Sequence, residues 1–171
     1  MWIFTDGSVP DAVMSELCLH SVHFVDVSQF QITSRMSWRF LIASEPVKMF
    51  EIRDIDGLML ARDKAAVDEW IKSGRKFHVL RDNPNHSRYP MSGGMWGGRR
   101  DSIPNMKQMV EKAAKNDYYM ADMDFLNGDI WNIVKNSVWA HDSYSLHKFG
   151  EDHPFPTERE NGEFVGSADF S

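Results

Sequence analysis

The amino-acid sequence predicts one α/β domain over residues 1–171, with a mostly parallel central sheet flanked by helices. The chain has the length of one domain, and a domain of this size buries roughly two thirds of its unfolded surface. Hydrophobic residues make up 42% and charged residues 26%, which is typical of globular proteins and excludes a fibrous or disordered class. Short apolar runs alternate with segments of helical periodicity, and this alternation indicates βαβ units.

The predicted strands are short runs rich in apolar residues and bounded by turn residues. The run at residues 91–98 differs from the others because it is rich in glycine. In chain order, the expected strands cover residues 2–5, 23–27, 49–54, 77–81, 91–98 and 137–141.

The predicted helices are recognised by apolar side chains three or four positions apart and by their terminal residues. Pro10 suits the first turn of the first helix. Asp63 is placed to cap the second helix, and Gly74 ends it. Pro104 opens the third helix, and a fourth runs from about residue 122 to 134. The last thirty residues are expected to be mostly irregular.

Composition and charge exclude several classes of partner. No run approaches the roughly 18 apolar residues of a membrane-spanning helix, and the first residues do not resemble a signal peptide. The lone Cys18 cannot form an internal disulfide, so we expect a soluble, cytoplasmic protein. The formal charge of −6, with Arg99-Arg100 as the nearest approach to a basic cluster, disfavours nucleic acid.

Two carboxylates follow the predicted strand at residues 49–54, within Arg53-Asp54-Ile55-Asp56. Ligands gather beyond the carboxyl ends of strands in α/β sheets, and residues i and i+2 of an extended segment point the same way. Two oxygen donors at one point suit Mg²⁺ or Mn²⁺ shared with a diphosphate. The same triplet also arises by chance, as Asp122-Met123-Asp124 illustrates, and turn residues with a helix cap are the alternative interpretation.

Several short motifs follow one another in an order that resembles a known protein family. They include Ser37-Trp38-Arg39-Phe40, Arg53-Asp54-Ile55-Asp56, Phe77-His78-Val79-Leu80-Arg81-Asp82, Gly93-Gly94-Met95-Trp96-Gly97, Asp122-Met123-Asp124-Phe125-Leu126-Asn127, His141-Asp142-Ser143 and His153-Pro154-Phe155-Pro156. This succession resembles a group of glycosyltransferase-like domains and, more distantly, the glycogenin-type retaining transferases of the GT-A fold. The resemblance implies a nucleotide-sugar donor, Mn²⁺ or Mg²⁺ as cofactor, and transfer of the sugar to an acceptor hydroxyl.

The resemblance also implies metal ligands and catalytic carboxylates. Asp54 and Asp56 match the residues that bind the metal and the donor diphosphate. His141 matches a late histidine that completes the metal shell, and a neutral imidazole suits Mn²⁺ better than Mg²⁺. Asp122 and Asp124 match the segment beneath the anomeric carbon, where a carboxylate either accepts the acceptor's proton or stabilises the developing positive charge.

A second group of residues is predicted to contact the donor. Arg39 and Arg53 are candidates to neutralise its diphosphate. Gly93 and Gly94 match the small residues that let the sugar and the acceptor lie against the backbone. Trp96 stands among these glycines, and for that reason we expect it near a ligand.

Two departures from the family pattern keep alternatives open. Met123 stands where the glycogenin-type segment has a glutamine, so inversion and retention both remain possible outcomes. Related domains also begin with a strand and helix of the nucleotide-base pocket, whereas this chain starts at the following strand and is expected to be N-terminally truncated. A partner chain or larger assembly would then supply that unit. The alternatives are a non-catalytic binding or structural module and a metal-dependent hydrolase of nucleotide sugars.

Overall fold

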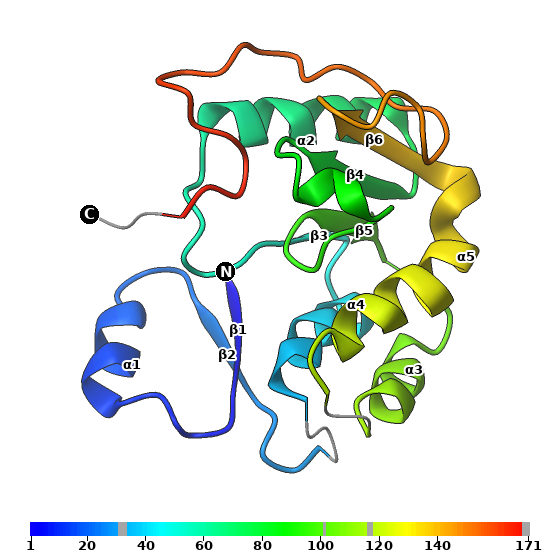
Figure 1. Ribbon diagram of the computed structural model, residues 1–171. Coiled ribbons are helices and arrows are strands. Elements are labelled where there is room, and N and C mark those ends of the chain that lie inside the picture. Colours follow the sequence, from blue (N-terminus) through cyan, green and yellow to red (C-terminus); the bar gives the residue numbers. More distant parts are fainter. Residues whose placement is uncertain (31–33, 101, 116–117, 169–171) are drawn as a thin grey trace.

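The structure, a computed structural model, describes residues 1–30, 34–100, 102–115 and 118–168 and arranges their strands in two sheets (Figure 1). In the first, β1 (Trp2–Thr5) pairs in parallel with β2 (His23–Asp26). The second has the order β3-β5-β4-β6. Its strands are β3 (Met49–Ile52), β4 (Phe77–Arg81), β5 (Trp96–Arg99) and β6 (Val138–Asp142).

The α/β class is confirmed, but the prediction of one mostly parallel sheet is wrong. Strand β5 is antiparallel to both β3 and β4, and β4 pairs in parallel with β6. A parallel pair needs a long crossover, usually a helix. Between β4 and β5 the chain has residues 82–95, whose one helical turn is the short 3-10 helix η2 (His86–Arg88). This short connection leads into β5, which runs antiparallel to β4. The longer helical segment between β5 and β6 allows β6 to run parallel to β4.

The helices occupy most of the predicted positions. In chain order, the structure has α1 (Asp11–Leu17), the 3-10 helix η1 (Arg35–Ser44), α2 (Ala61–Ser73), η2, α3 (Met106–Ala113), α4 (Ala121–Phe125), the π-helical turn η3 (Leu126–Ile130), α5 (Trp131–Val134) and the 3-10 turn η4 (Lys135–Ser137). The fourth predicted helix is therefore a continuous helical run with a π turn at its centre. Asp63 does not cap α2, because the helix begins two residues earlier, at Ala61.

The four-stranded sheet packs helices on both faces, with α2 on one side and η1, α3 and α4 on the other (Figure 1). Because side chains alternate along a strand, neighbouring residues of β4 enter different layers. Phe77 and Val79 belong to the larger core, whereas His78 stacks on Trp70 of α2 and Leu80 packs with Ala66. The larger core also contains Phe40, Phe50, Trp96, Val110, Phe125, Leu126 and Ile130. A polar side chain, His78, therefore lies in the layer beneath α2.

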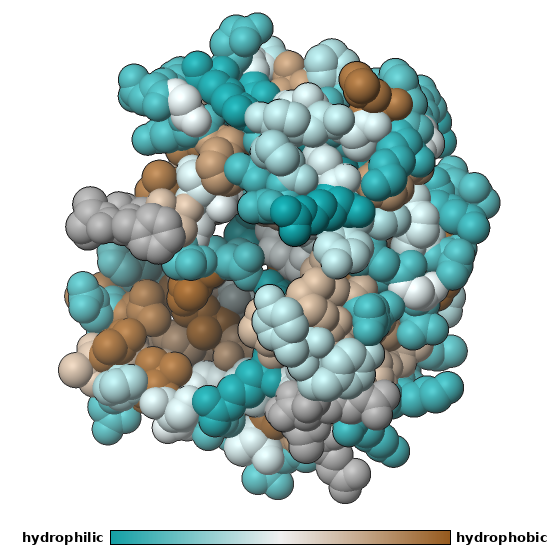
Figure 2. All heavy atoms as spheres, in the orientation of Figure 1, coloured by the Kyte–Doolittle hydropathy of each residue, from teal (hydrophilic) through white to brown (hydrophobic). Residues whose placement is uncertain are grey.

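The β1–β2 sheet borders a large groove. The groove has a volume of about 660 Å³ and is lined by residues of β1, η1, β3 and the segment 53–59. Figure 2 shows hydrophobic residues gathered in a hollow on the side of the molecule where β1 and β2 lie. Among the helices of the described segments, none is long and apolar enough to cross a membrane.

Candidate functional site

Arg39 of η1 binds two of the predicted carboxylates, those of Asp54 and Asp122. Arg39 donates from Nη1 to Asp54 Oδ1 and, at 3.1 Å, from Nη2 to Asp122 Oδ2. Its Nε donates to the carbonyl of Met36 at 2.9 Å, which fixes the guanidinium to its own helix. Charge-assisted hydrogen bonds of this kind are stronger than neutral ones. Arg39, Asp54 and Asp122 therefore form one cluster at the meeting point of η1, the end of β3 and α4.

The two predicted glycines pack against this cluster. A Cβ at Gly93 would lie 3.1 Å from the guanidinium carbon of Arg39, which is closer than most Cβ contacts. A Cβ at Gly94 would collide with the Asp54 carboxylate. The backbone approaches these charged groups so closely that position 94 accepts only glycine without a shift of Asp54. Both glycines therefore lie beside the charged residues, and their predicted contact with a sugar stays a prediction.

The segment that carries these glycines is anchored to the π turn of the helical run. Asn127 accepts a hydrogen bond from the backbone N of Met91 at 2.9 Å and donates to its carbonyl at 3.1 Å. The same side chain donates to the carbonyl of Met123 at 2.9 Å. π turns often occur at functional sites. Here the π turn contains the residue that fixes the start of the glycine segment, and the N–H and carbonyl of Met91 bind Asn127 and not a neighbouring strand.

Asp54 and Asp56 line a common cavity of about 120 Å³, together with His86, Gly94 and Gly166. The Asp54 side chain is 57% exposed to solvent. The Nδ1 atom of His86 is buried and has no hydrogen-bond partner among the residues that the structure describes. Burial lowers the pKa of His86, and the charges of Asp82 and Asp54 oppose that shift only in part. The cavity therefore combines two carboxylates with an imidazole that is neutral at neutral pH.

The donor chemistry of Asp54 and Asp56 fits Mg²⁺ or Mn²⁺, since both cations prefer carboxylate oxygens. Both residues line one cavity, but they lie in a turn that the Gly57 N–H closes on the Asp54 carbonyl at 3.0 Å, and not in the extended segment that the sequence predicts. Within residues 1–30, 34–100, 102–115 and 118–168, however, no three His, Cys, Asp or Glu side chains are arranged to hold a metal ion. The described residues thus offer two carboxylates, with open positions for water or a ligand.

His141 does not join Asp54 and Asp56, so its prediction as their third ligand is wrong. It is fully buried on β6, and both of its ring nitrogens have partners. Nδ1 lies 2.9 Å from Nε2 of His78, and Nε2 lies 3.0 Å from Oε2 of Glu69 on α2. A nitrogen that shares a proton with a neighbouring side chain is not free to bind a metal.

This buried hydrogen-bond chain extends to β3 and was missed in the sequence. Nδ1 of His78 lies 2.9 Å from Oε1 of Glu51. Glu51 and His78 both pair with Gly97 of β5, and the absence of a side chain there lets the Glu51 carboxylate cross the intervening strand. A histidine inside the apolar run 77–80 was the available signal, because a buried polar group needs a partner.

Arg53 lines the cavity and the groove, but its guanidinium makes four hydrogen bonds within the protein. Its Nε and Nη2 bind both oxygens of Asp63, at 2.9 and 2.8 Å. Its Nη1 donates to Glu51 at 3.1 Å and to the carbonyl of Ile52 at 2.7 Å. Burial disfavours the charge, but the bonds to Asp63 and Glu51 outweigh it and raise the pKa of Arg53. The residue anchors the end of β3 to α2.

Trp96 is a core residue, and the prediction that it lies near a ligand is wrong. Its side chain is fully buried, with its ring centroid 5.5 Å from that of Phe50 and 6.0 Å from that of Phe40. Strand alternation explains the error, because Trp96 pairs with Val79 and points into the same layer. The glycines around it accommodate backbone packing and do not open a site at the indole.

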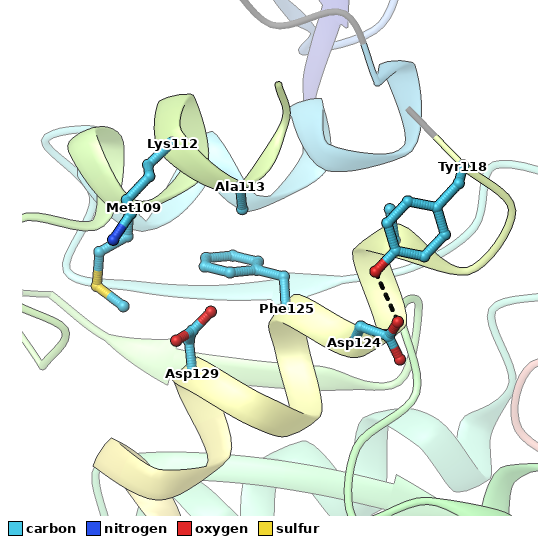
Figure 3. A pocket seen from close by; sticks show the side chains of 8 residues that line it. Met109, Lys112, Ala113, Tyr118, Asp124, Phe125 and Asp129 are labelled. Carbon is cyan, nitrogen blue, oxygen red and sulfur yellow. Dashed lines mark hydrogen bonds between the residues drawn. The ribbon is translucent and has the colours of Figure 1, made fainter. Parts of the chain in front are cut away.

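Asp122 and Asp124 lie on different sides of α4. Residues two apart in a helix do not face each other. Asp122 turns to Arg39, whereas Asp124 accepts a hydrogen bond of 2.7 Å from the Tyr118 hydroxyl at the end of a separate pocket (Figure 3). The two carboxylates therefore cannot serve one reaction centre, and Asp122 is the one that adjoins Asp54.

Comparisons of the chain with protein-family models, with curated proteins and with solved structures find no match. The site itself must therefore carry the functional argument. The predicted site residues that lie together beside the groove are Arg39, Asp54, Asp56, Gly94 and Asp122.

Proposed function

We propose that the chain binds a nucleoside-diphosphate sugar and transfers the sugar to an acceptor hydroxyl, with Mn²⁺ or Mg²⁺ held by Asp54 and Asp56. The observation that carries this proposal is the location of both carboxylates in one cavity next to a groove of about 660 Å³. Small-molecule sites commonly have volumes of about 300–1,000 Å³. The groove is large enough for a nucleotide, and the Arg39–Asp54 pair is part of its lining.

Two kinds of residue in the groove lining suit different parts of such a donor. Trp2, Phe4 and Trp38 give its walls aromatic surface, on which a nucleobase can stack. Arg39 lines the same groove and offers a planar guanidinium, which suits phosphate oxygens. In this proposal Arg39 leaves Asp54 and pairs with the diphosphate, and Asp54 then becomes available to the cation.

The chemistry follows from these positions. The cation, when bound, would stabilise the negative charge on the departing nucleoside diphosphate. The bond between the anomeric carbon and the diphosphate oxygen breaks, and the acceptor oxygen bonds to that carbon. The acceptor's hydroxyl proton goes to a carboxylate, and we assign this role to Asp122 because Arg39 holds it beside Asp54.

Thermal unfolding with MnCl₂ and nucleoside diphosphates tests the proposal. A ligand that binds the native state stabilises it by about 2.7 kcal/mol at one hundred times its Kd, which for this size corresponds to roughly 5–10 °C. We expect such a rise with at least one of UDP, GDP, ADP, CDP and dTDP, and we expect Asp56→Asn to abolish it. Asp68→Asn on α2 is the matched control and should keep the rise. The absence of a shift with every nucleotide in the unaltered protein contradicts the proposal.

One observation favours a binding module without catalysis as the second candidate. His141 is held by His78 and Glu69, so the two carboxylates lack the imidazole that completes the metal shell in the family that the sequence resembles. A binding module would show the nucleotide-dependent rise but would release no nucleoside diphosphate from any nucleotide sugar. Measuring that release with Mn²⁺ and a set of sugar acceptors separates the two functions.

Arg39→Met is expected to change two affinities in opposite directions. Without the guanidinium, Asp54 has no cationic partner, and Mn²⁺ should bind several-fold more tightly in the absence of nucleotide. The nucleoside diphosphate loses a charge-assisted hydrogen bond, so its affinity in the presence of Mn²⁺ should fall about tenfold. Calorimetric titration measures both. Arg75→Met, whose guanidinium pairs with Glu151 at 3.6 Å, should change neither, and a parallel loss of both affinities in Arg39→Met would contradict the exchange of partners.

A further inference from the structure

A second pocket, of about 320 Å³, lies between α3 and the helical run 121–134. It is independent of the Arg39–Asp54 cluster and of the groove beside β1. Met109 and Ala113 of α3 and Ala121 and Phe125 of α4 give it an apolar floor, and Phe125 is itself 4% exposed. Its volume lies at the small end of the range for ligand sites, so a compact ligand fits best.

The pocket has two chemically different ends (Figure 3). At one end, the hydroxyl of Tyr118 donates to Oδ2 of Asp124 at 2.7 Å. At the other end, Lys112 projects from α3 and Asp129 from η3, with the Phe125 ring between this end and the Tyr118–Asp124 pair. Neither Lys112 nor Asp129 forms a hydrogen bond or ion pair with any residue in the described part of the chain.

We propose that this pocket binds a free α-amino acid with an apolar side chain. The ligand's carboxylate pairs with the ammonium of Lys112, and its ammonium pairs with the carboxylate of Asp129. Its side chain then lies over Phe125 and Ala113, toward Tyr118. One positive and one negative group at the same end of an apolar pocket, without partners among the described residues, are complementary to a zwitterion.

The charge pattern distinguishes this ligand from its nearest alternatives. An apolar amine would leave Lys112 without a partner, and an apolar acid would leave Asp129 without one. A nucleotide or sugar phosphate would meet the carboxylates of Asp124 and Asp129 and be repelled. The loss of either charged hydrogen bond weakens binding about tenfold or more.

Calorimetric titration with four probes tests the proposal. L-phenylalanine carries both charges and an apolar side chain, 2-phenylethylamine lacks the carboxylate, 3-phenylpropanoate lacks the ammonium, and glycine lacks the side chain. We expect saturable binding of L-phenylalanine and at least tenfold weaker binding of each of the other three. Equal affinity for L-phenylalanine and either single-charge analogue overturns the proposal, as does the absence of saturable binding by phenylalanine, leucine and methionine.

Two variants assign each charge to its residue. Lys112→Met should weaken L-phenylalanine about tenfold and leave 2-phenylethylamine unchanged, because that amine makes no use of the lysine. Asp129→Asn should weaken L-phenylalanine and leave 3-phenylpropanoate unchanged. Unchanged binding of the analogue shows that the pocket of each variant is still folded. Lys72→Met on α2 is the control that should behave like the unaltered protein. If Lys112→Met weakens the amine as much as the amino acid, the assignment of the carboxylate to Lys112 is wrong.

Discussion

Asp63→Ala is expected to lower the free energy of unfolding by about 3–5 kcal/mol, because it leaves the buried charge of Arg53 without its main partner. Asp63 is 2% exposed, and both of its oxygens bind the Arg53 guanidinium. The Arg53 side chain is itself 12% exposed, so water does not replace the lost bonds. Urea denaturation at pH 7 measures the change.

The same helix offers a matched control. Asp68 of α2 pairs with Lys64 at 2.5 Å, but these side chains are 47% and 77% exposed. An exposed pair contributes little, so Asp68→Ala should cost less than about 1 kcal/mol. The double variant Arg53→Met with Asp63→Leu should recover much of the loss, since it removes both buried charges together. Equal effects of Asp63→Ala and Asp68→Ala would contradict a buried ion pair.

The Arg53–Asp63 pair also connects stability to the proposed site. Arg53 immediately precedes Asp54, and its bonds to Asp63 and Glu51 fix the end of β3 against α2. The direction in which Asp54 and Asp56 leave the strand therefore depends on a side chain that binds no ligand. At a temperature where Asp63→Ala is still folded, it should also reduce the nucleotide-dependent rise in unfolding temperature.

The parts of the site that could be predicted depend on local sequence. Asp54 and Asp56 follow β3 closely, and the turn that begins at Asp54 places both beside one cavity, although the extended geometry expected for them is absent. Gly94 accompanies them because only a residue without a side chain allows its backbone so close to the Asp54 carboxylate. Strand positions were predicted well for the same reason: β1 and β4 have the expected bounds, and β2, β3 and β6 differ by one or two residues at an end.

The parts that could not be predicted depend on distant pairings. The apolar pattern of a strand does not encode its direction, and the glycine-rich β5 has few side chains to indicate its neighbours, so the mixed sheet was missed. His141 was assigned from its place in a succession of motifs. Its actual partners, His78 and Glu69, are 63 and 72 residues away in the sequence, and only the assembled β4–β6 pair and α2 bring them together.

His141 should also make the protein less stable in mild acid. Burial lowers its pKa from the ordinary 6.5 to about 4, and the neighbouring His78 and His153 act in the same direction, while the bond to Glu69 opposes them. The unfolded chain therefore takes up a proton as the pH falls through 6.5, whereas the folded protein resists protonation until about pH 4. Stability is complete above pH 6.5 and declines toward pH 4, by about 3 kcal/mol at 1.36 kcal/mol per pKa unit.

Urea denaturation at pH 7.5, 6.5, 5.5 and 4.5 measures this decline and identifies the group responsible. His141→Asn should reduce the slope between pH 6.5 and 4.5 and leave the part that His86 contributes, since burial also lowers the pKa of His86. Its stability at pH 7.5 will be lower because His78 and Glu69 lose a partner. His20→Asn, on the exposed segment after α1, should keep the full slope. Carboxylates with a lowered pKa, such as Asp82 in its buried bonds to Arg62, respond only below their ordinary value of 3.8 and do not contribute in this range. A stability that is independent of pH from 7.5 to 4.5 would mean that water or a counter-ion reaches the His78–His141 pair, and that burial does not lower the pKa of His141.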